Sequence, residues 1–344
     1  MKAIPKTLLL LGLTSKASAL TIVVDYTFDT NGFFASSESQ AAIQAVADRY
    51  SRIITTNLLA VSPNSSTSRD WRIGFQHPGT GDNYEISTAA SAASDGLVSL
   101  GASAADEYGF GGLQADQWIL YAGGRSQSAI ASGGSGTGTN FTGTFDDISG
   151  PLHRGIDDNT PGAGSQNDLP RWGGASSFDS DQNWHFDIDS VAPQGTVDFY
   201  SIALHEVGHA LGLNTTWNQW ETDGAGLFLG QNTLDTFNAE NGTNLTGLAL
   251  ASDTNPHFAD NVFTSEIFEL ADPNLIGTVG LGEQQDLLMD PVFDLSEPGL
   301  SRQELTNVDV AALVDVGWTI IPEPSTALLV GVGGLLLARR RRSC

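Results

Sequence analysis

The most informative residues of this 344-residue chain are His205, Glu206 and His209, in the pattern His-Glu-Val-Gly-His. Residues four positions apart lie on the same face of a helix, so both imidazoles can bind one metal ion. Glu206 lies beside them and can reach a water molecule in the open coordination position of zinc. Because zinc lowers the pKa of such a water to about 7, Glu206 could take its proton for attack on a carbonyl and pass it to the leaving amine.

Two helices with clear start signals are expected around this pattern. Asp198 is suited to the N-cap of a helix over 199–211, and Gly212 follows where a left-handed turn would end that helix. Late in the chain, Thr306 can cap a second helix over 307–316. The histidine pair is therefore expected inside a capped helix.

The stretch HEVGHALG (205–212), the downstream Met289 and the closing helix together resemble a metzincin zinc metallopeptidase. The segment 172–179, followed by Trp184, is similar to the strand that precedes the zinc helix in matrixin-type members. The resemblance is good over 172–318 and loose before it. It implies that a methionine turn lies beneath the zinc site, with Met289 as its methionine, and an ordinary core methionine is the alternative.

The third metal ligand departs from the compact metzincin pattern. That pattern places a histidine six residues after His209, where this chain has Thr215, a poor zinc ligand. His257 is the only histidine further downstream, and we expect it to be the third ligand, after an insertion over 213–256 that resembles the insertion of leishmanolysin-like metzincins. The insertion contains Phe228, Leu234 and Phe237. A loop histidine, or Glu240 as ligand in a gluzincin arrangement, is the weaker alternative.

Hydrophobic periodicity predicts strands over 20–28, 71–75 and 117–121 and a helix over 37–59. The stretch 123–174 is rich in glycine, serine, asparagine and aspartate, and we expect it to be mostly loop. The resemblance implies an α+β, metzincin-like fold. It would have an N-terminal twisted mixed sheet with helices that include the zinc helix, and a smaller irregular C-terminal subdomain that ends in a helix.

The chain is expected to divide into four parts. These are a signal peptide at 1–19, an N-terminal peptidase subdomain with the zinc helix at 20–212, a C-terminal subdomain with the insertion, the methionine turn and the closing helix at 213–321, and a sorting tail at 322–344.

The two ends of the chain indicate export. Residues 1–19 begin with Lys2 and Lys6, continue with an apolar run and end with Ala-Ser-Ala, in the order of a secretory signal peptide. Residues 322–344 begin with Pro-Glu-Pro, continue with an apolar run shorter than the roughly 20 residues of a membrane span, and include four consecutive arginines. This tail resembles the PEP-CTERM sorting signal. The resemblance implies export through the inner membrane of a Gram-negative bacterium, transient membrane association through the tail, a sorting enzyme as partner, and a cell-surface or secreted protein.

Acidic clusters in the loop-rich region could bind calcium through carboxylate oxygens. They are Asp146–Asp147, Asp157–Asp158 and the pair Asp179 and Asp181. None has the spacing of a calcium-loop motif, so ordinary surface acids are the alternative.

The charge of the chain excludes some partners. It has 40 acidic and 15 basic residues, and a formal net charge of −25. Such a charge repels phosphate backbones, so we expect no nucleic-acid partner. Without the two ends, and with a cut after Pro324, eight arginines remain against 40 acidic residues, a net charge of −32. The single cysteine, Cys344, excludes a disulfide scaffold.

These features predict an exported zinc-dependent endopeptidase that hydrolyses peptide bonds by a metal-activated water, with a protein or peptide as substrate. His205, His209 and His257 would bind zinc, and Glu206 would be the catalytic base. The alternative is a non-catalytic surface or extracellular-matrix protein with a vestigial metal site, because many proteins with such tails are structural or adhesive.

Overall fold

The computed structural model describes residues 20–58, 72–87, 114–139, 172–213, 223, 226–252, 255–260, 262–268, 284–291 and 302–321. These segments form a mixed α+β fold with four helices among them. The predicted signal peptide, the sorting tail, Thr215 and the acidic pairs at 146–147 and 157–158 lie outside the described residues. No helix in the described segments is long and apolar enough to cross a membrane.

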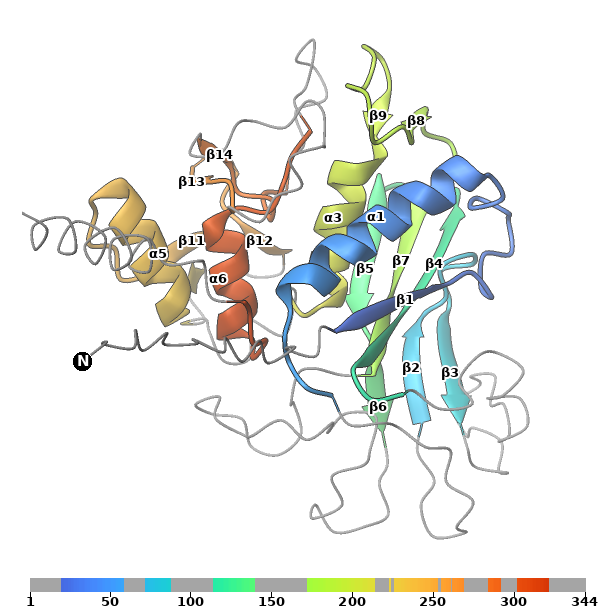
Figure 1. The fold of residues 1–344 in the computed structure, drawn as a ribbon, viewed down its shortest axis with the longest axis horizontal. Helices are drawn as coiled ribbons and strands as arrows, with labels where there is room; N and C mark the ends of the chain where they lie inside the picture. Colours follow the sequence, from blue (N-terminus) through green and yellow to red (C-terminus); the bar gives the residue numbers. More distant parts are fainter. Residues whose placement is uncertain are drawn as a thin grey trace, which may run out of the picture.

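A four-stranded mixed sheet packs against the helix that contains His205 and His209 (Figure 1). In the order in which they pair, its strands are β1 (Thr21–Asp25), β4 (Gln117–Arg125), β7 (Gly173–Asp179) and β5 (Ala131–Ser135). β1, β4 and β7 are parallel, and β5 is antiparallel to β7 at one edge. The mixed sheet predicted for the N-terminal part is therefore present.

β4 separates two apolar layers because its side chains alternate between the faces of the sheet. Trp118 and Leu120 belong to the main core, which they share with helices α1 (Ser37–Ile53) and α3 (Phe199–Ala210). Ile119 and Tyr121 belong to a smaller cluster with residues of a second sheet. That sheet consists of β2 (Arg72–Gln76), β3 (Asn83–Ser87) and β6 (Thr137–Thr139). Helices thus cover one face of the main sheet, and the small sheet covers the other.

The prediction that 123–174 is mostly loop is wrong for the part of this stretch that the structure describes. β4 continues to Arg125, β5 and β6 follow, and β7 begins at Gly173. β5 reads Ala-Ser-Gly-Gly-Ser and has no apolar alternation. It lies so close to α3 that a Cβ on Gly133 would be 2.0 Å from the carbonyl oxygen of Glu206. Such close packing requires small residues, which hydrophobic periodicity cannot detect.

The predicted insertion is folded in its described part, and its three large apolar residues are buried in the main core. The elements from here to the end of the fold are β10 (Leu227–Phe228), α5 (Gln231–Asn241), β11 (Leu248–Ser252), β12 (Asn255–Phe258), β13 (Thr264–Glu266), β14 (Gln284–Asp286) and α6 (Asn307–Asp315). α5 lies beside α6 (Figure 1). The Asp315 carboxylate of α6 accepts from the backbone N–H groups of Asn232 at 3.0 Å and Thr233 at 2.9 Å, and so caps α5. β12 pairs with β11 and carries His257 back toward α3.

α3 and α6 begin where the sequence predicts. The short parallel strands β8 (Trp184–His185) and β9 (Val197–Asp198) lead into α3. Asp198 caps α3 by accepting from Ser201 N–H at 3.0 Å. Thr306 and Asp309 form a capping box in which each side chain accepts from the backbone N–H of the other. Both start signals are confirmed because a cap depends on residues that are neighbours in the sequence.

A buried ion pair joins α1 to the segment before α6. Arg49 Nε lies 2.9 Å from Glu304 Oε1, and both side chains are 0% exposed. The hydroxyl group of Tyr200 on α3 donates to the second carboxylate oxygen of Glu304 at 3.2 Å. Close by in the sequence, Arg302 binds the carboxylate of Asp198 at 2.7 Å. These contacts hold α1, the start of α3 and the segment before α6 together.

Replacing Arg49 with methionine should lower the free energy of unfolding by about 3–5 kcal/mol, because it leaves the Glu304 carboxylate buried without its cation. Arg52→Met on the exposed side of α1 is the matched control and should change it by about 0.5 kcal/mol or less. Urea denaturation of both variants measures the difference. A loss of stability at Arg49 no greater than at Arg52 would contradict the role assigned to the ion pair.

Candidate metal centre

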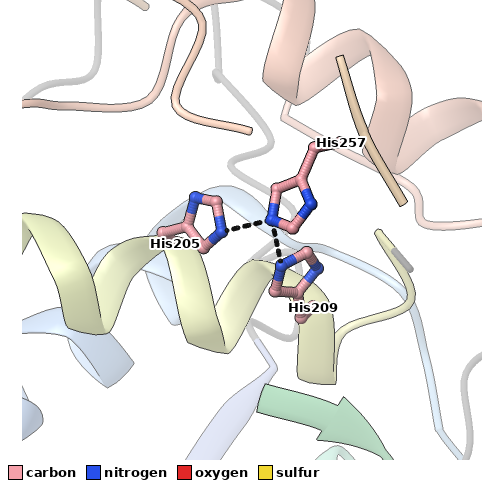
Figure 2. A group of neighbouring side chains, drawn as sticks. All are labelled: His205, His209 and His257. Atoms are coloured by element: carbon pink, nitrogen blue, oxygen red, sulfur yellow. Dashed lines mark hydrogen bonds between the residues drawn. The ribbon is translucent and has the colours of Figure 1, made fainter. Parts of the chain in front are cut away.

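Three histidines from two distant parts of the chain converge on one point (Figure 2). His205 and His209 come from α3, and His257 comes from β12. Nε2 of His257 lies 3.0 Å from Nε2 of His205 and 3.0 Å from Nε2 of His209. The two α3 histidines are buried and His257 is partly buried. The structure therefore brings together the three residues that the sequence predicts as ligands.

The end of α3 sets the orientation of the His209 ring. Gly212 has a φ of +114°, a conformation that favours glycine. It lets Leu213 N–H donate to Gly208 O at 3.0 Å and Gly212 N–H to His209 O at 3.1 Å, so the helix ends and the chain turns back. The turn places the Leu213 carbonyl oxygen 2.5 Å from His209 Nδ1. Since a carbonyl only accepts, Nδ1 carries the proton and Nε2 presents its lone pair to the cluster.

The turn that contains Met289 positions the other two histidines. The Leu288 carbonyl lies 2.6 Å from His205 Nδ1, so this ring also carries its proton on Nδ1 and presents the Nε2 lone pair. The Met289 carbonyl accepts from Phe258 N–H at 3.0 Å, directly after the third histidine. The sulfur of Met289 lies against Gly208, where an added Cβ would be 3.1 Å from it. Met289 therefore packs beneath the turn of α3 that separates the two helix histidines.

The donor set of this cluster fits zinc. His205 and His209 both present Nε2 lone pairs toward Nε2 of His257, so one cation can bind all three nitrogens. Burial, followed by the neighbouring His209, lowers the pKa of His257 to about 3, and burial lowers the pKa of His209 to about 4. The rings are therefore neutral at pH 7, which is the form that binds metal. The Nε2–Nε2 distances of 3.0 Å are close to the roughly 3.3 Å that follow from tetrahedral zinc with bonds of about 2.0–2.1 Å.

Glu206 lies between the two helix histidines in the sequence and is also buried. It is 6% exposed, and its Oε2 has no hydrogen-bond partner. Burial raises the pKa of this carboxyl from 4.5 to about 8, and a hydrogen bond from the backbone of Gly133 opposes the rise. A carboxyl group with a pKa near the working pH and an unoccupied oxygen is suited to take a proton and return it.

Other candidate ligands have different partners. The carboxylate of Glu240 accepts from Ser265 Oγ at 2.7 Å and from Asn307 Nδ2 at 2.7 Å, so it is part of the packing between α5, β13 and α6. The three histidines are the only group of its kind in the segments that the structure describes. Asp179 and Asp181 do not form a second such group, so nothing in these segments supports the calcium prediction.

Two residues near the site were not predicted from the sequence. Gly133 contacts Glu206 from β5, and no sequence signal marks this contact. Asp309 accepts from the backbone N–H groups of Leu288 and Met289 in the methionine turn. For Asp309 a partial signal exists, because a carboxylate three residues after Thr306 is typical of a capping box.

Comparison with known proteins finds metallopeptidase matches for part of the chain. Residues 155–220 match the matrixin family model. Over 41 residues the chain is 51% identical to Matrix metalloproteinase-2 of Drosophila melanogaster, a match that covers 12% of this chain and 5% of that protein. No solved structure matches the chain. These matches support a metzincin-like zinc metallopeptidase. The matched segment contains His205, Glu206 and His209, whereas His257 lies beyond it.

Gly133→Ala should disturb the site, because the added Cβ would lie 2.0 Å from the carbonyl oxygen of Glu206. β5 would have to move away from α3, which we expect to lower the free energy of unfolding by roughly 1–3 kcal/mol. Gly134→Ala is the matched control, since nothing lies within 4 Å of a Cβ at that position. Urea denaturation compares the two variants, and equal stability would show that β5 does not press against α3.

The raised pKa of Glu206 predicts a pH dependence of the metal-free protein. Because the folded pKa of about 8 exceeds the ordinary 4.5, the folded state holds the proton more tightly than the unfolded state. The stability due to the neutral carboxyl is present below pH 4.5 and is lost as the pH rises to about 8. Relative to Glu206→Gln, the free energy of unfolding of the wild type should therefore fall by on the order of a few kcal/mol across this pH range. Urea denaturation of both proteins in chelator measures it, and parallel pH profiles would contradict the prediction.

Proposed function

We propose that this protein is an exported zinc-dependent endopeptidase in which His205, His209 and His257 bind the metal and Glu206 is the catalytic base. The observation that carries the proposal is the convergence of three imidazole Nε2 atoms, together with the burial of Glu206, which follows His205 in the sequence. The two helix histidines and the glutamate also lie in the segment that matches the matrixin model. A three-histidine donor set leaves a coordination position for water or substrate, as catalytic zinc sites do.

The chemistry is divided between the metal and the carboxylate. Zinc held by three histidines lowers the pKa of water and polarises a carbonyl group. Oε2 of Glu206, which has no protein partner, accepts the proton of the attacking water. The same carboxyl then donates this proton to the leaving amine nitrogen of the cleaved peptide bond. The Gly133 N–H supports the carboxylate from β5 through both transfers.

β5 is the strand along which we place the substrate. Among the described strands it is the outer one next to β7, and it packs against α3, the helix that contains His205 and His209. An extended peptide can add to such an edge through backbone hydrogen bonds, which require no particular side chains. In metzincins the peptide pairs with an edge strand above the zinc helix, and β5 has the corresponding position relative to α3.

Export is the second part of the proposal. It is supported by the signal-peptide pattern of residues 1–19 and by the PEP-CTERM-like tail at 322–344. Cleavage after Ala19 would leave Leu20 as the first residue, and Leu20 is 1% exposed in the main core. A sorting enzyme would act on the tail, and the protein would reach the surface or the medium of a Gram-negative cell.

The second candidate function is that of a non-catalytic surface protein with a vestigial metal site. The tail favours it, because such tails also occur on structural and adhesive proteins. The buried Glu206 favours the enzyme, because a structural zinc site needs no carboxylate with an unpartnered oxygen.

Glu206→Gln should reduce cleavage of casein by about 10²- to 10⁴-fold, because the amide cannot take the proton. Zinc content should stay at the wild-type level, since Glu206 is not one of the proposed ligands. Proteolysis assays and metal analysis on the same purified samples measure both properties. Zinc binding by the wild type without cleavage of any protein offered would support the non-catalytic alternative.

His257→Ala tests the ligand set in the same experiment. We expect loss of zinc and of activity, because two histidines hold the metal weakly. His185→Ala is the matched control, because this histidine is hydrogen-bonded to Ser190 and is not part of the cluster. Full zinc occupancy and activity in His257→Ala would refute the assignment of the third ligand.

A further inference from the structure

A single carboxylate on α6 holds the methionine turn. Asp309 is 0% exposed, and its oxygens accept four hydrogen bonds. Oδ2 accepts from Thr306 N–H at 3.0 Å, Thr306 Oγ1 at 2.6 Å and Leu288 N–H at 3.0 Å, and Oδ1 accepts from Met289 N–H at 3.3 Å. All four donors are neutral groups. The carboxylate therefore belongs both to the cap of α6 and to the turn beneath the metal cluster.

The bond from Met289 has a consequence for His205, because one peptide group joins the two side chains. The N–H of Met289 and the C=O of Leu288 are the two ends of the same peptide unit. Asp309 Oδ1 binds its N–H end at 3.3 Å, and His205 Nδ1–H binds its C=O end at 2.6 Å. A negative charge at the N–H end polarises the peptide and makes its carbonyl a stronger acceptor. A stronger acceptor at Nδ1 makes the opposite nitrogen, Nε2, more basic toward a metal.

His209 and His257 are not linked to Asp309 through a single peptide group. The Nδ1–H group of His209 binds the carbonyl of Leu213, which belongs to the end of its own helix. His257 is held through the backbone of the next residue, whose N–H donates to Met289 O in the following peptide unit. His205 is the histidine that Asp309 reaches through one peptide group.

We propose that Asp309 is a positioning residue for the metal centre, which acts on His205 through the Leu288–Met289 peptide group. This rests on the proposed metal site. The carboxylate orients the peptide, the peptide fixes the tautomer and direction of the His205 ring, and the charge strengthens the metal-binding nitrogen. Partners of this kind typically change metal affinity by about 10- to 100-fold.

Asp309→Asn separates this role from the capping of α6. Three donors meet at Oδ2 and one at Oδ1, so the asparagine amide keeps most bonds with its oxygen in the Oδ2 position. The NH2 group of the asparagine then faces Met289 N–H, so only the hydrogen bond to the Leu288–Met289 peptide group is lost. Thr306→Val is the matched control, because it removes the hydroxyl of the cap and leaves the carboxylate and its bond to Met289.

The first measurement is zinc affinity by competition with a chromophoric chelator, without any substrate. We expect zinc affinity to be about 10- to 100-fold weaker in Asp309→Asn. In Thr306→Val we expect zinc affinity to change by less than about threefold, even if urea denaturation shows that both variants lose similar stability. The second is the resonance of the histidine Nδ1–H protons in the zinc-loaded proteins. The His205 proton should move upfield in Asp309→Asn because its hydrogen bond weakens, while the His209 proton should not move.

The proposal would be overturned if folded Asp309→Asn bound zinc within threefold of the wild-type affinity. It would also be overturned if the His205 and His209 protons shifted equally, because equal shifts indicate a general loosening of the site. If Asp309→Asn does not fold even in saturating zinc, Asp309→Ser takes its place with the same expectations. A wild type that binds no zinc would refute the metal site itself. Tight wild-type binding with an unchanged variant refutes only the role of Asp309.

Discussion

The site depends on the convergence of three imidazole Nε2 atoms, with Nε2 of His257 at 3.0 Å from each of the other two. His205 and His209 present their Nε2 lone pairs to this point, because each Nδ1–H is bound to a buried backbone carbonyl. Protonation is also opposed, since burial lowers the pKa of all three histidines. A cation can bind all three nitrogens at no cost to these hydrogen bonds. The fold thus holds the histidines in the arrangement that metal binding needs.

The two carbonyls that enforce this arrangement have different origins. Leu213 belongs to the end of α3, so its position follows from Gly212 and the local turn. Leu288 lies far along the chain and depends on α6, whose Asp309 binds the turn from the other side. His257 directly follows the insertion, and α5 within the insertion is capped by α6. α6 therefore supports two of the three histidines, although it contributes no ligand.

Sequence reasoning predicted the parts of this site that depend on short-range rules. The caps at Asp198 and Thr306 and the helical spacing of the histidine pair are local, and they occur where predicted. The contact between Gly133 and Glu206 could not be predicted, because a strand of small residues has no hydrophobic period. The bond from Asp309 to the methionine turn also spans a distance that no short motif records. Non-local contacts through backbone atoms leave almost no trace in residue types.

Glu206 links metal binding to proton transfer. Burial of this side chain, which is 6% exposed, disfavours its ionised form and raises its pKa to about 8. A bound cation favours the carboxylate, so metal binding and ionisation of the base assist each other. A site that only held a structural ion would gain nothing from this coupling and would lose stability by burying an unpartnered oxygen. Burial of Glu206, which follows His205 in the sequence, therefore favours the proposed proton transfer over a metal that only holds the fold together.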